Sequence, residues 1–111
     1  CPYKLKQTSW WMFDEVAQVC KELFPEGDGS HATASEVAVT YYAYPQAVKD
    51  VVMTPKTAPE GRFTDAADYR KNFPDGRIGS DPSQATPEKG KRIVEVAKKA
   101  LIREVEAYFA S

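Results

Sequence analysis

The C-terminal quarter of the chain carries the most regular pattern of hydrophobic and polar positions. Thr86 can cap a helix through its hydroxyl group, Pro87 suits the first helical position, and Glu88 suits the first turn. Apolar residues then recur every three or four positions and form one continuous stripe: Ile93, Val96, Ala97, Ala100, Leu101, Val105, Tyr108 and Phe109. We therefore predict a helix of roughly 35 Å, whose stripe must be covered by a sheet or by other helices.

A strand and a helix are predicted at the start of the chain. Residues 3–9 place Tyr, Leu and Thr between Lys and Gln, which is typical of a short strand. Apolar residues recur at helical spacing from Phe13 to Phe24, and Ser9 is placed to cap this helix. Pro25 ends it. Few other strands are indicated, so we expect the surface that covers the C-terminal stripe to come from another part of the protein or another subunit.

A second helix is predicted from a capping box, in which Thr33 and Glu36 can each bond the other's backbone N–H group. Residues 37–42 are β-branched and aromatic and would also suit a strand. We favour the helix because the cap is specific and Pro45 closes the segment. Residues 54–83 are rich in Pro, Gly and Asp, which predicts an irregular segment of the kind that is usually functional or packs on a partner.

The composition is that of an ordinary globular protein. The 111 residues suffice for one domain, and 42% of them are hydrophobic and 28% charged. No apolar run approaches the ~20 residues of a membrane helix, and the N-terminal residues do not resemble a signal peptide. The chain does not begin with Met, so we expect further residues to precede Cys1.

Charge and cysteine usage exclude several kinds of partner. The net charge is -1 and the basic residues are scattered, so nothing predicts a surface for nucleic acid. Cys1 and Cys20 do not form the C-x-x-C pair of a zinc ribbon or a thioredoxin-like motif. We expect Cys20 to be a small core residue and Cys1 to be incidental. A cytoplasmic protein that binds neither nucleic acid nor membrane is therefore expected.

The only histidine of the chain is the first candidate for acid/base chemistry. An imidazole exchanges protons near neutral pH, and His31 lies between a Gly-rich loop and a capped helix start, where side chains often face a cleft. From composition alone, a residue that simply hydrogen-bonds at the helix start is the better interpretation. Glu36 can either orient His31 or complete the capping box with Thr33, and the residues alone favour the capping box.

The adjacent Trp10 and Trp11 would point about 100° apart on a helix. One of them can fill the core while the other faces a pocket. The alternative interpretation is that both rings pack in the core.

Other kinds of catalytic site have little support in these residues. One histidine and scattered carboxylates do not have the spacing of metal ligands. A Ser–His–Asp triad that used Ser30 or Ser35 would lack the G-x-S-x-G turn that presents such a nucleophile. Asp28 and Asp81 lie in turn sequences, where Asp is expected for structural reasons. A metal centre made by this chain alone is therefore not predicted.

Four segments, taken in order, carry a family resemblance. Residues 3–11 form a strand-to-helix segment that ends in a tryptophan pair, and residues 29–36 are similar to a G-H-A-G-x-x-E-T-S motif. Residues 44–48 hold a Pro and a Val downstream of that motif. Residues 76–90 are similar to a closing G-x-x-G-D-P-x-x-A-T-x-E-x-G signature, which is the most specific of the four. In these segments the chain resembles the creatininase family.

The resemblance implies an α/β fold of three layers, α/β/α, with a mainly parallel sheet and helices on both faces. Residues 1–111 would be the C-terminal half of one such domain. It also implies a homohexameric, metal-dependent hydrolase that acts on a small-molecule amide, cyclic or linear. The divalent ions, zinc or manganese, would be bound mainly by residues absent from this chain. Those residues would belong to an N-terminal half of the same protein or to a companion chain.

The same resemblance assigns roles within this half. His31 would be the catalytic acid/base, Glu36 would support it, and Trp10 and Trp11 would help to close the substrate pocket. Gly27 stands where creatininase itself has a substrate-contacting tryptophan, which leaves the substrate open. The alternative is a non-catalytic interaction or assembly domain that has kept half of a hydrolase fold.

Overall fold

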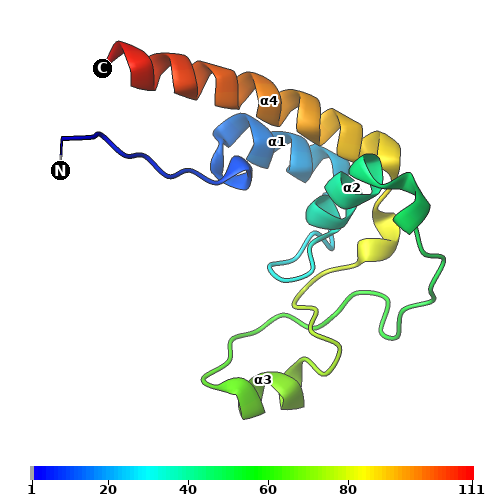
Figure 1. Ribbon diagram of the computed structural model, residues 1–111. Coiled ribbons are helices and arrows are strands. Elements are labelled where there is room, and N and C mark those ends of the chain that lie inside the picture. The colour runs from blue at the N-terminus through cyan, green and yellow to red at the C-terminus, as the bar shows by residue number, and fades with distance from the viewer. Residues whose placement is uncertain (1) are drawn as a thin grey trace.

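The computed structural model describes residues 2–111, and Cys1 lies outside the described residues. Helices dominate this part of the chain (Figure 1). The α-helices are α1 (Asp14–Leu23), α2 (Ala34–Ala43), α3 (Ala66–Asn72) and α4 (Pro87–Ala110). Short 3-10 helices are η1 (Trp10–Met12), η2 (Pro45–Ala47) and η3 (Pro82–Gln84). Within residues 2–111, none of the helices is both long and apolar enough to cross a membrane.

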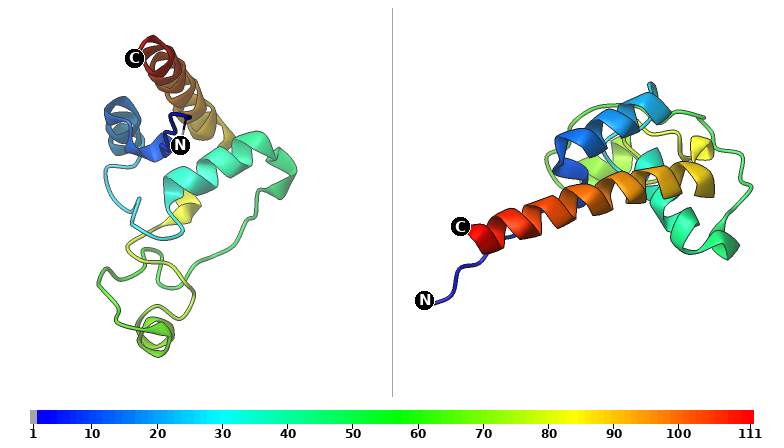
Figure 2. Two further views of the ribbon diagram at one scale, coloured as in Figure 1. Left: turned by 60° about the vertical axis from the view of Figure 1, so that its left-hand side comes forward. Right: turned by 90° about the horizontal axis from the view of Figure 1, so that it is seen from above.

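The predicted layered α/β fold is wrong for residues 2–111, which contain no strand and no sheet. The only β-type pairing among them is one isolated antiparallel bridge between His31 and Ile78. Residues 3–9 do run as an extended segment, but they lie beside the C-terminal end of α4 rather than beside a strand (Figure 2). A strand is stabilised by hydrogen bonds to a neighbouring strand, and the described chain places no such neighbour there.

Capping groups set the starts of α2 and α4, as predicted. The Thr33 hydroxyl oxygen accepts the Glu36 N–H at 3.1 Å, and the Glu36 carboxylate accepts the Thr33 N–H at 3.4 Å. Thr86 accepts the N–H group of Lys89 at 3.2 Å, and Pro87 begins α4. These side chains satisfy N–H groups that the first turn of a helix leaves without a partner. The capping box and the helix that follows it are therefore confirmed.

The start of α1 differs from the prediction. The side chain of Ser9 makes no capping hydrogen bond, and the residues after it form η1 instead of the first turn of α1. The α-helix begins at Asp14, after an extended Phe13. Its end at Leu23, before Pro25, agrees with the prediction.

The core lies where α1, α2 and the first half of α4 meet (Figure 1). The buried residues there are Val16, Val19, Cys20, Phe24, Ala34, Ala38, Ala85 and Ile93. Further along α4 the predicted stripe loses its cover, and Leu101, Val105 and Phe109 are exposed. Phe109 keeps 81% of its surface accessible, so the second half of α4 presents an apolar face.

The segment between α2 and η3 is more ordered than its composition predicted. It contains α3, which was not predicted, and Asp65 caps this helix by accepting the Asp68 N–H at 2.9 Å. The helix has seven residues and buries none of them, so it has no apolar stripe that a sequence pattern could reveal.

A buried arginine holds the same segment together. Arg77 is only 5% exposed, and its guanidinium donates to the carbonyl oxygens of Pro55, Lys56 and Ser80 at 2.7, 2.9 and 3.2 Å. It also donates to the Asp75 carboxylate at 2.9 Å. A buried charge must be paired and hydrogen-bonded to be tolerated, and Arg77 meets that requirement by joining two stretches of backbone.

Candidate functional site

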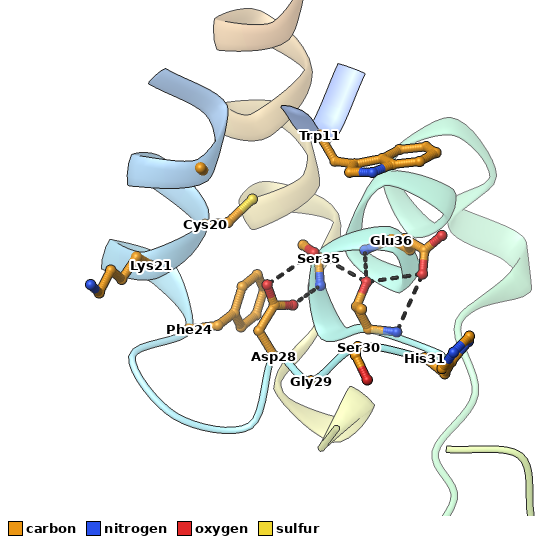
Figure 3. Close-up of a pocket in the computed structure, with 12 residues that line it drawn as sticks. Trp11, Cys20, Lys21, Phe24, Asp28, Gly29, Ser30, His31, Ser35 and Glu36 are labelled. Carbon is orange, nitrogen blue, oxygen red and sulfur yellow. Dashed lines mark hydrogen bonds between the residues drawn. The ribbon is translucent and has the colours of Figure 1, made fainter. Parts of the chain in front are cut away.

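A cleft of about 550 Å³ lies between α1, the loop that follows it and the start of α2 (Figure 3). Three of the four predicted site residues, His31, Glu36 and Trp11, line it. The remaining lining residues are Ala17, Cys20, Lys21, Phe24, Asp28, Gly29, Ser30, Thr33 and Ser35. The cleft therefore brings a potential proton donor, carboxylates and an aromatic wall to one hollow.

Asp28 fastens the loop after α1 to the start of α2. Its carboxylate accepts the N–H of Ser35 at 2.9 Å and the Ser35 hydroxyl at 3.2 Å (Figure 3). Its backbone carbonyl accepts the Ala34 N–H at 3.2 Å. With Thr33 bonded to the Glu36 N–H, the first N–H groups of α2 all have partners. The turn sequence around Asp28 predicts a structural Asp but does not predict this contact.

The backbone of His31 is fixed by the segment that precedes η3. Its carbonyl oxygen accepts the Ile78 N–H at 3.2 Å and the Ser80 hydroxyl at 3.1 Å. Gly29, with φ of 80°, passes so close that a Cβ atom there would lie 2.5 Å from the Ile78 carbonyl oxygen. Only glycine fits such a contact at a positive φ. The Gly-rich loop thus allows His31 to reach the backbone of residues 78–80.

The side chains of His31 and Glu36 have different partners. The imidazole lies 6.1 Å from the ring of Phe63 and 6.0 Å from the ring of Tyr69, measured between centroids. The carboxylate of Glu36 accepts the Thr33 hydroxyl at 3.0 Å as part of the capping box. No hydrogen bond joins His31 to Glu36 among the described residues, and the catalytic roles of both stay predictions.

The two tryptophans have different surroundings: Trp10 packs against the core and Trp11 lines the cleft. Trp10 is half-buried and packs against the core, where it also lines a separate apolar groove of about 330 Å³ beside α4. Trp11 is 54% exposed and lines the cleft that contains His31. Their rings meet edge to face with centroids 5.6 Å apart. The proposed binding of substrate by either residue stays a prediction, and only Trp11 lies at the cleft.

Cys20 forms part of the inner wall of the cleft. It is buried, as expected for a small core residue. Burial raises the pKa of the thiol to about 11, the charge of Asp28 adds to this rise, and a hydrogen bond with Ser35 opposes it. Only the thiolate is a strong nucleophile, so Cys20 is unsuited to covalent catalysis near neutral pH.

The described residues do not fit a metal centre of their own. Within residues 2–111, no group of three or more His, Cys, Asp or Glu side chains could hold a metal ion. The two carboxylates of the cleft are already engaged, Asp28 with Ser35 and Glu36 with Thr33. Among the described residues, neither the Ser30 nor the Ser35 hydroxyl hydrogen-bonds to His31, and the Ser35 hydroxyl contacts Asp28 and Thr33 instead.

Comparison with known proteins agrees with the resemblance noted in the sequence. A search of the curated proteins found no match. The model of the creatininase family, described as creatinine amidohydrolase, matches residues 3–105. That span includes α1, α2, α3, most of α4 and every residue that lines the cleft. The chain belongs to the creatininase family.

Proposed function

We propose that this chain supplies the acid/base group and part of the substrate pocket of an amide hydrolase. Membership of the creatininase family supports an amidohydrolase-like function. The observation that carries the proposal is the cleft, which gathers Trp11 from η1, His31 from the loop between α1 and α2, and Glu36 from α2. Its volume of about 550 Å³ suits a small-molecule substrate, cyclic or linear.

The reaction needs a proton donor for the departing nitrogen. Water adds its oxygen to the carbonyl carbon, the C–N bond breaks, and the products are a carboxylate and an amine. An amide nitrogen leaves poorly unless it is protonated, and His31 in its imidazolium form donates that proton. Trp11 offers an aromatic wall against which a flat amide ring packs. Glu36 lines the same cleft, and its negative charge complements the protonated imidazole of His31.

The creatininase family is generally metal-dependent. We propose that the divalent ions, zinc or manganese, are held by residues outside this chain, because residues 2–111 offer no fitting group of ligands. The roles assigned to His31, Glu36 and Trp11 do not depend on how those ions are bound.

The partner is proposed from the uncovered face of α4. Leu101, Val105 and Phe109 expose apolar surface along one side of the helix, and the apolar Leu5 lies exposed beside them. Contiguous apolar patches of this kind mark interaction sites. The N-terminal half of the same protein or a companion chain would cover this face, within a homo-oligomer. The buried free thiol of Cys20 fits a reducing, cytoplasmic location.

A non-catalytic interaction or assembly domain is the second candidate function. It is favoured by the same exposed face of α4. It is also favoured by Glu36, whose carboxylate serves the capping box instead of contacting His31.

Turnover by a His31 variant separates the two functions. The purified protein, with the chains that co-purify with it, would be given creatinine and hydantoin, and ring-opened products would be followed by mass spectrometry. We expect His31→Asn to lower turnover by about 10²- to 10⁴-fold, the usual contribution of a general acid. Metal content and melting temperature should stay unchanged. Normal turnover in this variant would remove the catalytic role and leave the interaction domain.

A further inference from the structure

Two aromatic side chains lie beside the ring of His31, on the same side of it, and neither has a role in the reaction described above. Phe63 and Tyr69 approach the imidazole edge to face, with centroids 6.1 and 6.0 Å away. Their own rings are 4.6 Å apart, also edge to face. The three rings therefore form one cluster, in which His31 is the only member that also lines the cleft.

Tyr69 is held in place by contacts with residues other than His31. Its hydroxyl group donates to the carbonyl oxygen of Gly76 at 2.6 Å. Its ring lies 5.5 Å from that of Phe73, which is buried. Tyr69 is thus fixed at both ends, by a hydrogen bond and by packing. Phe63 is 45% exposed and its ring contacts that of Tyr69, so Phe63 and the exposed His31 form the solvent side of the cluster.

The His31 ring lacks another source of orientation in the described residues. Its backbone is held by Ile78 and Ser80, but those contacts leave the side-chain torsions free. Glu36 directs its carboxylate to Thr33. Edge-to-face aromatic contacts prefer defined ring geometries, so two of them on one imidazole restrict its rotation.

We propose that Phe63 and Tyr69 are positioning residues, which hold the imidazole of His31 in the orientation from which it serves the cleft. This inference rests on the proposed function, in which His31 donates the proton. Rate depends steeply on the placement of a proton donor, because a small displacement lengthens the path to the reacting nitrogen. The segment that carries α3 then acts on the reaction through His31 and need not touch the substrate.

The test combines nuclear magnetic resonance with kinetics on the whole protein. The imidazole C–H signals of His31 are identified as those missing from the His31→Asn spectrum. Phe63→Leu should move these signals, because the neighbouring ring current is lost. It should lower kcat about tenfold with little change in KM, since ring placement and not substrate binding is altered. Phe63→Tyr keeps the ring and should restore both readouts.

A second variant and a control complete the design. Tyr69→Phe keeps the ring but loses the bond to Gly76, and should give smaller changes in the same direction. Tyr44→Leu removes an exposed aromatic ring outside the cluster and should leave the His31 signals and kcat unchanged. Melting temperatures on the same samples show that each variant is folded.

The possible outcomes are distinct. Phe63→Leu with unmoved His31 signals would overturn the contact itself. Moved signals with normal kcat, while His31→Asn is inactive, would overturn positioning and leave the proposed function standing. Normal turnover in His31→Asn would instead overturn the proposed function, and the positioning role would fall with it. Moved signals, a lowered kcat and rescue by Phe63→Tyr would support the inference.

Discussion

The backbone of Gly90 in α4 lies so close to Ala38 in α2 that a Cβ atom at position 90 would be 1.9 Å from the Ala38 carbonyl oxygen. Both residues are buried, and α2 and α4 share the most extensive contact between any two helices of the described chain. The absence of a side chain at position 90 lets the two helices approach backbone to backbone. This crossing supports α2, whose first turn forms one wall of the cleft.

Gly90→Ala should therefore destabilise the protein, although alanine is the better helix former by about 1 kcal/mol. The added methyl group meets backbone, which cannot rotate away as a side chain would, so the helices must separate. We expect the free energy of unfolding to fall by roughly 2 kcal/mol or more, measured by denaturant titration. Lys91→Ala, at the exposed next position, is the matched control and should have little effect. A variant as stable as the parent would show that the helices are further apart.

The Cys20 thiol should make stability fall at high pH. Its pKa is raised from 9.0 to about 11, chiefly by burial, so the folded state keeps a proton that the unfolded chain loses. The protonated thiol therefore makes its full contribution to the free energy of unfolding below pH 9, and this contribution is lost as the pH rises towards 11. The free energy of unfolding of Cys20→Ala, measured beside that of the parent across this pH range, should not show this decline.

Other groups titrate in the same pH range, so the informative quantity is the difference in unfolding free energy between the parent and Cys20→Ala. Asp28→Asn provides a second check, because the charge of Asp28 is the next cause of the rise in the Cys20 pKa. This variant should lower the pKa of Cys20 while retaining a side chain of the same shape. Parallel stability profiles for the parent and Cys20→Ala would contradict the assignment.

Arg77→Ala should loosen the segment that carries α3. It leaves the carbonyl groups of Pro55, Lys56 and Ser80 without their charged donor, and we expect a loss of roughly 3 kcal/mol in unfolding free energy. The pKa of Asp75 is lowered, first by the side-chain hydrogen bond from Arg77, and should rise towards its ordinary value in this variant.

Hydrogen exchange locates the effect of the Arg77 change. Amides in residues 55–61 should exchange faster in Arg77→Ala, whereas those in the middle of α4 should respond less. Arg70→Ala, an exposed arginine in the last turn of α3, is the control. Equal exchange in the two variants would show that Arg77 does not organise this segment.

Short-range signals predicted the starts of α2 and α4, although the same kind of signal at Ser9 did not set the start of α1. Thr33 with Glu36, and Thr86 with Pro87, act within one turn, so their effect can be read from neighbouring residues. The expected sheet failed because strand pairing joins distant segments, and residues 3–9 have no extended neighbour in the described chain. The layered fold follows from the resemblance and not from a pattern of strands in the sequence.

The site was predictable only in part, for the same physical reason. His31 and Glu36 lie five positions apart, and the Gly-rich loop and capping box near them are local features. The contact of His31 with Phe63 and Tyr69 joins residues more than thirty positions apart. Neither aromatic residue lies in a motif, and Tyr69 belongs to a helix without an apolar stripe. Their contact with His31 could therefore be recognised only in the structure.

Glu36 has a structural role and a predicted catalytic one, and three substitutions separate them. Glutamine still completes a capping box, so Glu36→Gln should keep the melting temperature while losing the charge. Glu36→Ala loses both the cap and the charge. Thr33→Ala removes the hydroxyl cap, at a cost of about 1 kcal/mol, but keeps the Glu36 carboxylate.

We expect Glu36→Gln to lower turnover about tenfold, less than His31→Asn, because an acid/base residue outweighs the group that supports it. Thr33→Ala should instead lower the melting temperature and change turnover per folded molecule little. If Glu36 acted only as a cap, Glu36→Gln would have normal turnover, and Glu36→Ala would differ from the parent only in stability. Turnover and melting temperature measured on the same samples therefore decide the role, since the charge acts on the rate and the cap acts on folding.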